Sequence, residues 1–169
     1  MSAVAELRNK LLCAGYSPIP VLGKRPASIG WQQKLVTNAD EIKLWDTVFP
    51  YASNTGILTK VTPTIDIDIL NPEAAEAIER LARGHFEERG FVPVRIGKAP
   101  KRAILLGTDK PFKKIARSFV SPCSSEREPE KIELLGDGQQ VVAFGVHPDT
   151  GQAYRWHGGE SRWSSLPTR

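Results

Sequence analysis

The run Thr64-Ile65-Asp66-Ile67-Asp68-Ile69 limits what this chain can fold into more than any other segment. Because successive side chains of a strand point to opposite faces, both aspartates fall on one face and the three isoleucines on the other. The two aspartates then lie roughly 7 Å apart. Aspartate is a poor strand former, so two of them on one face cost stability unless water or a cation receives them. The run therefore predicts a strand with one aliphatic face and one acidic face.

A second acidic strand is predicted from Lys131 to Leu135, where Glu133 interrupts aliphatic neighbours. If the two strands are neighbours, Glu133 joins Asp66 and Asp68 in a three-carboxylate site, the kind that holds two Mg²⁺ or Mn²⁺ ions for in-line phosphoryl transfer. One ion lowers the pKa of an attacking hydroxyl, and the other neutralises the triphosphate and the departing pyrophosphate. Two plainer interpretations stay open: the aspartates only solubilise an exposed face, and Glu133 is a rim carboxylate paired with Lys131.

Positive charge is concentrated in the middle of the chain. The net charge is only +4, yet residues 89–117 hold nine Lys or Arg residues and a single acid, Asp109. This excess suits a polyanionic partner, although a solvated basic surface is the plain alternative. Cations near a strand edge can meet a triphosphate as charge-assisted donors. The candidates for this phosphate-binding role are Arg95, Lys98, Lys101 and Arg102.

His147 is the remaining candidate for a nucleotide contact. It lies in a turn rich in Pro, Asp and Gly, where its ring nitrogens can bond a sugar or a phosphate, or simply brace the loop. His85 and His157 lack partners at metal-ligand spacing, so they are given no role.

Length and composition favour one compact intracellular unit. The 169 residues, 40% of them apolar, are enough to bury one substantial core. Cys13 and Cys123 are too few and too far apart for a disulfide framework or a four-ligand zinc site, and they are expected to be reduced thiols. No apolar run approaches the roughly 20 residues of a membrane span, and the opening residues lack the apolar stretch of a signal peptide. We therefore expect a soluble, cytoplasmic protein with no membrane partner.

The pattern of apolar residues predicts an α+β fold. Helices are expected from residues 3 to 14, after a capping Asn38, and after Asn71 with Pro72 in the first turn. The pair Asp137-Gly138 predicts a tight hairpin between the last two strands. Strands are expected at residues 18–22, 56–58, 64–70, 92–96, 102–106, 132–135 and 140–144.

Short blocks follow one another in a distinctive order along most of the chain. The early ones are Gly15 to Pro20, Lys24 to Pro26, Gly30-Trp31 and Asn54 to Ile57; the later ones are Arg95 to Arg102, Glu133 to Gln140, and Gly145 to Gly151 with Tyr154 and Trp156. In this order they resemble the bifunctional primase-polymerase (Prim-Pol) N-terminal domains of the archaeo-eukaryotic primase superfamily, which are common in phages, plasmids and other mobile elements.

The resemblance implies both a fold and a site. It implies a mixed sheet with a catalytic half like an RNA-recognition motif (RRM), an N-terminal α/β unit beside it, and a catalytic cleft between the two. It also implies that Asp66, Asp68 and Glu133 are the metal ligands. One departure stands out: many relatives carry a histidine near the nucleotide phosphates in the middle motif, whereas residues 100–106 contain none. Lys101 or Arg102 would take over that contact.

The leading hypothesis is template-directed primer synthesis or DNA polymerisation on a single-stranded DNA template, with NTP or dNTP as substrate. Residues 1–169 would form a single catalytic domain, cut from a longer replication protein that carries a helicase downstream. A noncatalytic replication-initiation module that binds DNA is the alternative from another class. A carboxylate nuclease follows from the same two-metal chemistry and is the third hypothesis.

Overall fold

The chain folds into two antiparallel sheets stacked between helices. The computed structural model describes residues 1–34 and 36–157. The N-terminal sheet has the strand order β2-β1-β3-β9, and the acidic sheet, which contains the aspartates, has the order β10-β5-β6-β4-β8-β7. The first comprises β1 (Pro18–Leu22), β2 (Arg25–Pro26), β3 (Asn54–Leu58) and β9 (Gln140–Phe144); the second comprises β4 (Thr64–Asp68), β5 (Val94–Ile96), β6 (Arg102–Leu105), β7 (Ile115–Phe119), β8 (Glu130–Leu135) and β10 (Arg155–Trp156).

The three predicted helices form where their capping residues indicate. They are α1 (Ala3–Cys13), α2 (Ala39–Val48) and α3 (Pro72–Phe86), and two short 3₁₀ turns lie at Trp31–Gln33 and Glu87–Arg89. Asn38 begins α2 with a full capping box to Glu41. Asn71 caps α3 by accepting a bond from the backbone N–H of Ala74. Each cap satisfies backbone groups that a helix start leaves without a partner.

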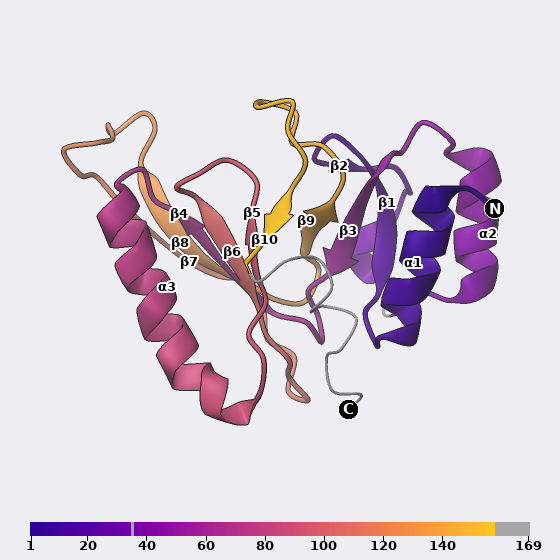
Figure 1. The fold of residues 1–169 in the computed structure, drawn as a ribbon, viewed down its shortest axis with the longest axis horizontal. Coiled ribbons are helices and arrows are strands. Elements are labelled where there is room, and N and C mark those ends of the chain that lie inside the picture. The colour runs from indigo at the N-terminus through magenta and orange to yellow at the C-terminus, as the bar shows by residue number, and fades with distance from the viewer. Residues whose placement is uncertain (35, 158–169) are drawn as a thin grey trace.

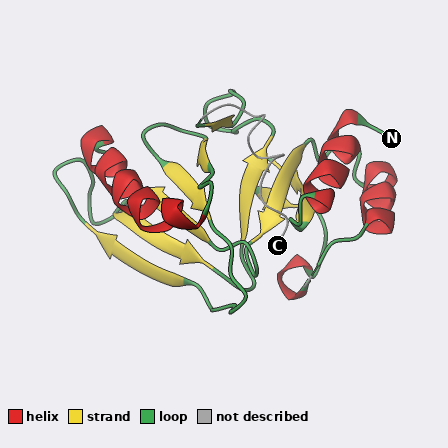
Figure 2. Ribbon diagram, turned by 60° about the horizontal axis from the view of Figure 1, so that its bottom comes forward, coloured by secondary structure: helices red, strands yellow, loops and turns green. Residues whose placement is uncertain are grey.

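The helices and sheets form layers (Figure 1), and three apolar clusters of the described residues hold these layers together. Helices α1 and α2 cover the outer face of the N-terminal sheet through residues such as Ile19 and Ile42. Helix α3 covers the isoleucine face of β4, where Ile67 is fully buried. The two sheets meet through a third cluster that includes Leu105 and Val141. Figure 2 shows the same order of layers, with α3 on one side and α1 and α2 on the other.

The structure confirms the α+β class and corrects two details of the prediction. The expected mixed sheet is wrong, because the named strands form two sheets in which every ladder is antiparallel. The expected hairpin at Asp137-Gly138 is also wrong. Both edges of β8 are taken by β4 and β7, so the turn carries the chain across to the N-terminal sheet, where β9 pairs with β3.

The two cysteines form no disulfide with each other. Cys13 and Cys123 are both free and exposed. Among the described residues, no helix has the length and apolar character needed to cross a bilayer.

Glu79 anchors α3 to the acidic sheet. Its side chain is only 5% exposed, accepts a charge-assisted bond from Arg102 of β6, and lies 2.9 Å from Nδ1 of His157. Burial acts to raise the Glu79 pKa, but the hydrogen bond from Arg102 and the interaction with His157 outweigh it, so the pKa lies below its ordinary value. The ionised form of Glu79 is therefore the one that stabilises the fold.

Replacing Glu79 with glutamine is expected to cost about 2–4 kcal/mol of unfolding free energy at pH 7, because it leaves a buried guanidinium without its counter-charge. Since the folded-state pKa of Glu79 is lowered, its contribution is complete above the unfolded pKa and is lost as the pH falls through the folded pKa. Urea unfolding should show the gap between wild type and Glu79→Gln shrinking from roughly pH 5 to pH 3. The exposed Glu76→Gln on the same helix is the control, and a gap that stays constant over that range would count against this role.

Candidate active site

One cross-strand row of the acidic sheet carries the predicted ligands. Asp66 on β4 is paired directly with Glu133 on β8, and on its other side with Ala103 on β6, which is paired with Arg95 on β5. Directly paired residues of antiparallel strands point to the same face, with Cα atoms roughly 4.5–5.5 Å apart. Asp68 follows on the same face, opposite Lys131. The row therefore lies on the face of β4 opposite to the one that α3 covers.

A polar pocket of about 260 Å³ opens over this row, between the two sheets. Its walls come from the acidic sheet, from β9 and the loop that follows it, and from the β1–β2 turn. Of the residues predicted for the site, Glu133 alone is not part of the lining. The lining residues are Lys24, Asp66, Asp68, Arg95, Lys98, Lys101, Arg102, Leu135, Gln140, Val141, Val142, His147, Asp149 and Tyr154.

Asp66 and Arg95 are the oppositely charged neighbours of Ala103 in the row. Ala103 is paired with both and is fully buried. Burial raises the pKa of Asp66; the charge of Arg95 opposes this rise, and the carboxylates of Asp68 and Glu133 add to it. Burial likewise lowers the pKa of Arg95, against the attraction of Asp66. The Arg95 Nε is buried and has no hydrogen-bond partner among the described residues. The row thus holds a buried carboxylate, Asp66, and a buried guanidinium nitrogen, Arg95 Nε, that lacks a hydrogen-bond partner among the described residues.

The other two carboxylates are bound by lysines. Asp68 is paired with Lys101. Glu133 accepts bonds from Lys114 Nζ at 2.6 Å and from Lys131 Nζ at 3.0 Å, and its side chain is 9% exposed. Burial acts to raise the Glu133 pKa, but these two bonds outweigh it and the pKa lies below its ordinary value. Both carboxylates therefore lie against ammonium groups.

The donor set of the row fits a divalent cation, although the side chains are not gathered around one point. Among the described residues, no three His, Cys, Asp or Glu side chains are arranged as a group that could hold a metal ion. Carboxylate oxygens are the hard ligands that Mg²⁺ and Mn²⁺ prefer. Asp66 shares its sheet face with Asp68 and Glu133, and a divalent cation would remove the repulsion among the three carboxylates. Asp66, Asp68 and Glu133 are the residues that would hold such an ion.

His147 is buried in the pocket wall in a defined orientation. Its ring is paired with Tyr154 at 5.4 Å between centroids, and its Nδ1 accepts the backbone N–H of Asp149 at 3.2 Å. Burial, with the charge of Lys24, lowers the His147 pKa, so the ring is neutral at physiological pH and Nε2 carries its proton. A Cβ at Gly97 would lie 2.5 Å from Tyr154 Cε1 and 2.8 Å from His147 Cδ2, so this packing requires glycine there.

Comparison with known protein families identifies the family of this chain. A sequence model described as "Bifunctional DNA primase/polymerase, N-terminal" (Prim-Pol) matches residues 10–169, which is nearly the whole chain. The chain belongs to the Prim-Pol family. No curated protein matches it at a significant level. The family implies a primase or polymerase activity in general, and the resemblance described from the sequence blocks is confirmed.

Asn54 positions two loops of the Prim-Pol pocket, a role that the sequence did not indicate. It is 3% exposed, and its Nδ2 donates to the carbonyls of Gly23 and Val146, each at 2.8 Å. Its Oδ1 accepts the Val146 N–H at 2.9 Å. Gly145 has φ of +110°, and a Cβ there would lie 2.0 Å from Asn54 Oδ1. Lys24 follows Gly23 and His147 follows Val146, and both line the pocket. Asn54 therefore holds the two loops that carry these residues.

Arg102 is placed differently from the other candidate cations. It is paired with Ile67 and Ile96, so its side chain shares the face that α3 covers, and its guanidinium is bound to Glu79. Arg95, Lys98 and Lys101 remain beside the carboxylates in the pocket. Arg102 also lines the pocket, but its guanidinium is already bound to Glu79.

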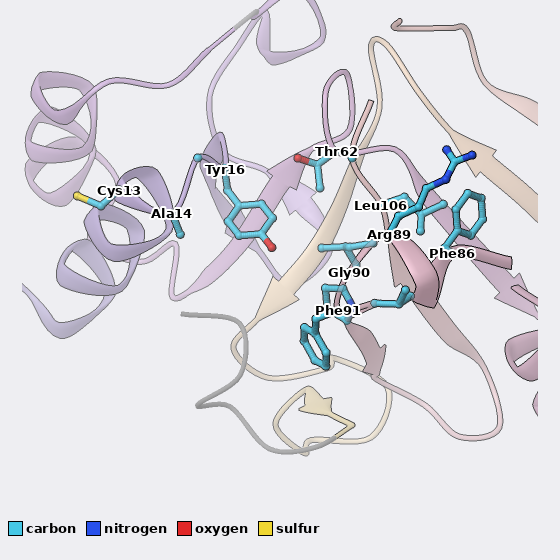
Figure 3. Close-up of a pocket in the computed structure, with 14 residues that line it drawn as sticks. Cys13, Ala14, Tyr16, Thr62, Phe86, Arg89, Gly90, Phe91 and Leu106 are labelled. Atoms are coloured by element: carbon cyan, nitrogen blue, oxygen red, sulfur yellow. The ribbon is translucent and has the colours of Figure 1, made fainter. Parts of the chain in front are cut away.

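A larger cavity of the domain is unsuited to phosphate chemistry. It has a volume of about 520 Å³ and lies between the end of α1 and the segment before β5, where Tyr16, Phe86 and Phe91 contribute to its lining (Figure 3). Arg89 is the only charged residue among the described residues that line it, and none of them is a carboxylate. The polar pocket over Asp66 is therefore the candidate active site.

Proposed function

We propose that this Prim-Pol domain catalyses template-directed nucleotidyl transfer, as primer synthesis, DNA polymerisation or both, with Mg²⁺ or Mn²⁺ as cofactor. The observation that carries the proposal is the direct pairing of Asp66 with Glu133, beside Asp68, on a sheet face that borders a cation-lined pocket. Family membership supports the reaction class. The position of the three carboxylates on one face of two paired strands supports the choice of ligands.

The bound ions would supply a Lewis acid for the triphosphate and a lowered pKa for the attacking hydroxyl. The chain's own residues bind and orient the nucleotide. Arg95, Lys98 and Lys101 neutralise the phosphates as charge-assisted donors, in place of the family's middle-motif histidine. His147 donates from Nε2 to a sugar or phosphate oxygen. Arg102, bound to Glu79, positions β6 under the pocket without touching the nucleotide.

The proposal extends to the partners. A single-stranded DNA template and an NTP or dNTP are the expected ligands, and a helicase domain in a longer parent protein is the expected neighbour. The likeness of the acidic sheet to an RRM core belongs to this proposal as well. Its support is the position of the two acidic strands, β4 and β8, as neighbours inside one antiparallel sheet.

A noncatalytic DNA-binding module is the second candidate function. The ion pairs of Asp68 with Lys101 and of Glu133 with Lys114 and Lys131 favour it, because these carboxylates already have counter-charges without any metal. In that case the carboxylates would be structural, and the basic residues alone would bind DNA phosphates.

Incubation with single-stranded template, labelled nucleotides and either Mg²⁺ or Mn²⁺ distinguishes the candidates. The proposal predicts extended product that disappears when EDTA removes the metal. Metal-independent DNA binding without incorporation would support the noncatalytic module, and shortened substrate would indicate a nuclease. Persistent incorporation by the Asp66→Ala, Asp68→Ala double variant would defeat the assigned mechanism.

A further inference from the structure

Three lysines occupy the positions where a divalent ion would neutralise the row. Lys101 pairs with Asp68, and Lys114 and Lys131 pair with Glu133. None of the ion pairs among the described residues involves Asp66. The two outer carboxylates of the proposed ligand set thus carry ammonium partners, while the central carboxylate between them does not.

An ammonium group and a divalent ion compete for the same carboxylate oxygens. Like charges roughly 4 Å apart repel by about 1 kcal/mol in water and by several times more near a protein surface, so a metal ion and these lysines do not share the row without cost. The lysine side chains are long and 35 to 38% exposed, so they can swing into solvent without disturbing the sheet. Exchange of lysine for metal is therefore sterically simple.

We propose that Lys101, Lys114 and Lys131 are internal counter-cations that hold the row in the metal-free domain and are released when a divalent ion binds. This inference rests on the proposed function. The lysines hold the carboxylates of Asp68 and Glu133 in place, and they weaken metal binding until a nucleotide brings its own negative charge. They are positioning residues for the metal site.

Release sends the lysines to two different sides of the row. Lys101 lines the nucleotide pocket, so once freed from Asp68 it is available to the triphosphate. Lys114 precedes β7 and Lys131 lies on β8, on the side of β4 away from β6. Among the described residues, α3 is the helix that packs on this sheet, and it packs on the opposite face. The exchange would therefore couple metal binding to a gain of positive charge toward the nucleotide on one side and toward nucleic acid on the other.

The first test is lysine-reactivity mapping of the wild-type domain by mass spectrometry after mild acetylation, with and without Mn²⁺. Acetylation of Lys101, Lys114 and Lys131 should rise severalfold when Mn²⁺ is added, because their ammonium groups lose their carboxylate partners. Lys113 is the internal control, since it pairs with Asp137 at 2.9 Å outside the row and its reactivity should stay constant. Unchanged reactivity of all four lysines at saturating Mn²⁺ would overturn the inference.

The second test is Mn²⁺ titration of single variants without nucleotide, with free Mn²⁺ followed by electron paramagnetic resonance. Lys114→Met and Lys131→Met should each bind Mn²⁺ about 3- to 10-fold more tightly than wild type. Each variant leaves Glu133 one lysine partner, which protects the fold. Lys113→Met should match wild type. Equal affinity in all proteins would overturn the exchange and leave the proposed function standing, whereas no Mn²⁺ binding by wild type, with or without nucleotide, would overturn the proposed function itself.

Discussion

Asp66→Asn is expected to lower nucleotide incorporation by about 10³-fold or more while leaving the domain folded. Asparagine keeps the shape of the side chain but removes the charge at the centre of the row. Because burial raises the Asp66 pKa, the ionised carboxylate is disfavoured by folding at neutral pH, so its neutral replacement should be no less stable than wild type. Loss of activity together with retained or increased stability is the signature of a functional carboxylate.

The measurement combines a primer-extension rate with a thermal unfolding midpoint for the same preparation. Asp109→Asn, in an exposed loop, is the matched control and should retain the wild-type rate and midpoint. An Asp66→Asn protein that keeps its activity would remove Asp66 from the mechanism. A variant that loses activity only because it unfolds would contradict the electrostatic account of this position.

Arg8→Met is expected to lower the unfolding free energy by about 3–5 kcal/mol, the largest stability effect in the domain that we predict. Arg8 on α1 is 1% exposed, and its Nη2 donates to the carbonyls of Ala52 at 2.6 Å and Asn54 at 3.0 Å. Its Nε donates to Thr55 Oγ1 at 3.2 Å. Burial lowers the Arg8 pKa to about 10, which reflects how fully the guanidinium is removed from water. Methionine fills the space of the stem but leaves the two carbonyls without donors.

Urea unfolding at pH 7 measures this loss. The exposed Lys10→Met on the same helix should change stability by less than about 0.5 kcal/mol. Because Asn54 holds the pocket loops and its carbonyl is one of the acceptors, nucleotide affinity should weaken with Arg8→Met even under conditions where the variant stays folded. Equal midpoints for the two variants would show that the Arg8 bonds contribute little.

Local chemistry explains why so much of the fold could be predicted. The caps at Asn38 and Asn71 are satisfied by residues three positions away, so their sequence signals need no tertiary information. The alternation in β4 fixes which residues share a face, and the structure places Ile67 against α3 and Asp66 on the other side. The adjacency of the Asp66 and Glu133 strands, which the three-carboxylate hypothesis required, is what the register shows.

Features that depend on which strands pair could not be predicted from the sequence. An Asp-Gly turn indicates where the chain reverses but not whether the flanking strands pair, and here β8 already has two partners. Strand β7 was missed because its five residues are all exposed and show no clean alternation. Arg102 was grouped with the phosphate-binding candidates because its face depends on the β4–β6 register, which sets it toward Glu79.

Two of the three lysine–carboxylate ion pairs of the row could not be predicted from the sequence. Lys131 is two residues from Glu133 on the same strand face, so that contact follows from strand geometry. Lys101 and Lys114 reach the carboxylates only because β6 and β7 pair beside β4 and β8. The roles of Asp66, Asp68 and Glu133 as ligands stay predictions until a metal is observed.

Anomalous diffraction from crystals of the domain grown with Mn²⁺ and an incoming nucleotide tests most directly whether Asp66, Asp68 and Glu133 bind the metal. We expect Mn²⁺ to be bound by carboxylate oxygens of Asp66 and Glu133, with Asp68 beside them. The phosphates should lie against Lys98 and Lys101, and Lys114 should be turned away from Glu133. Mn²⁺ held elsewhere, with Glu133 still paired to Lys114 and Lys131, would contradict this expectation.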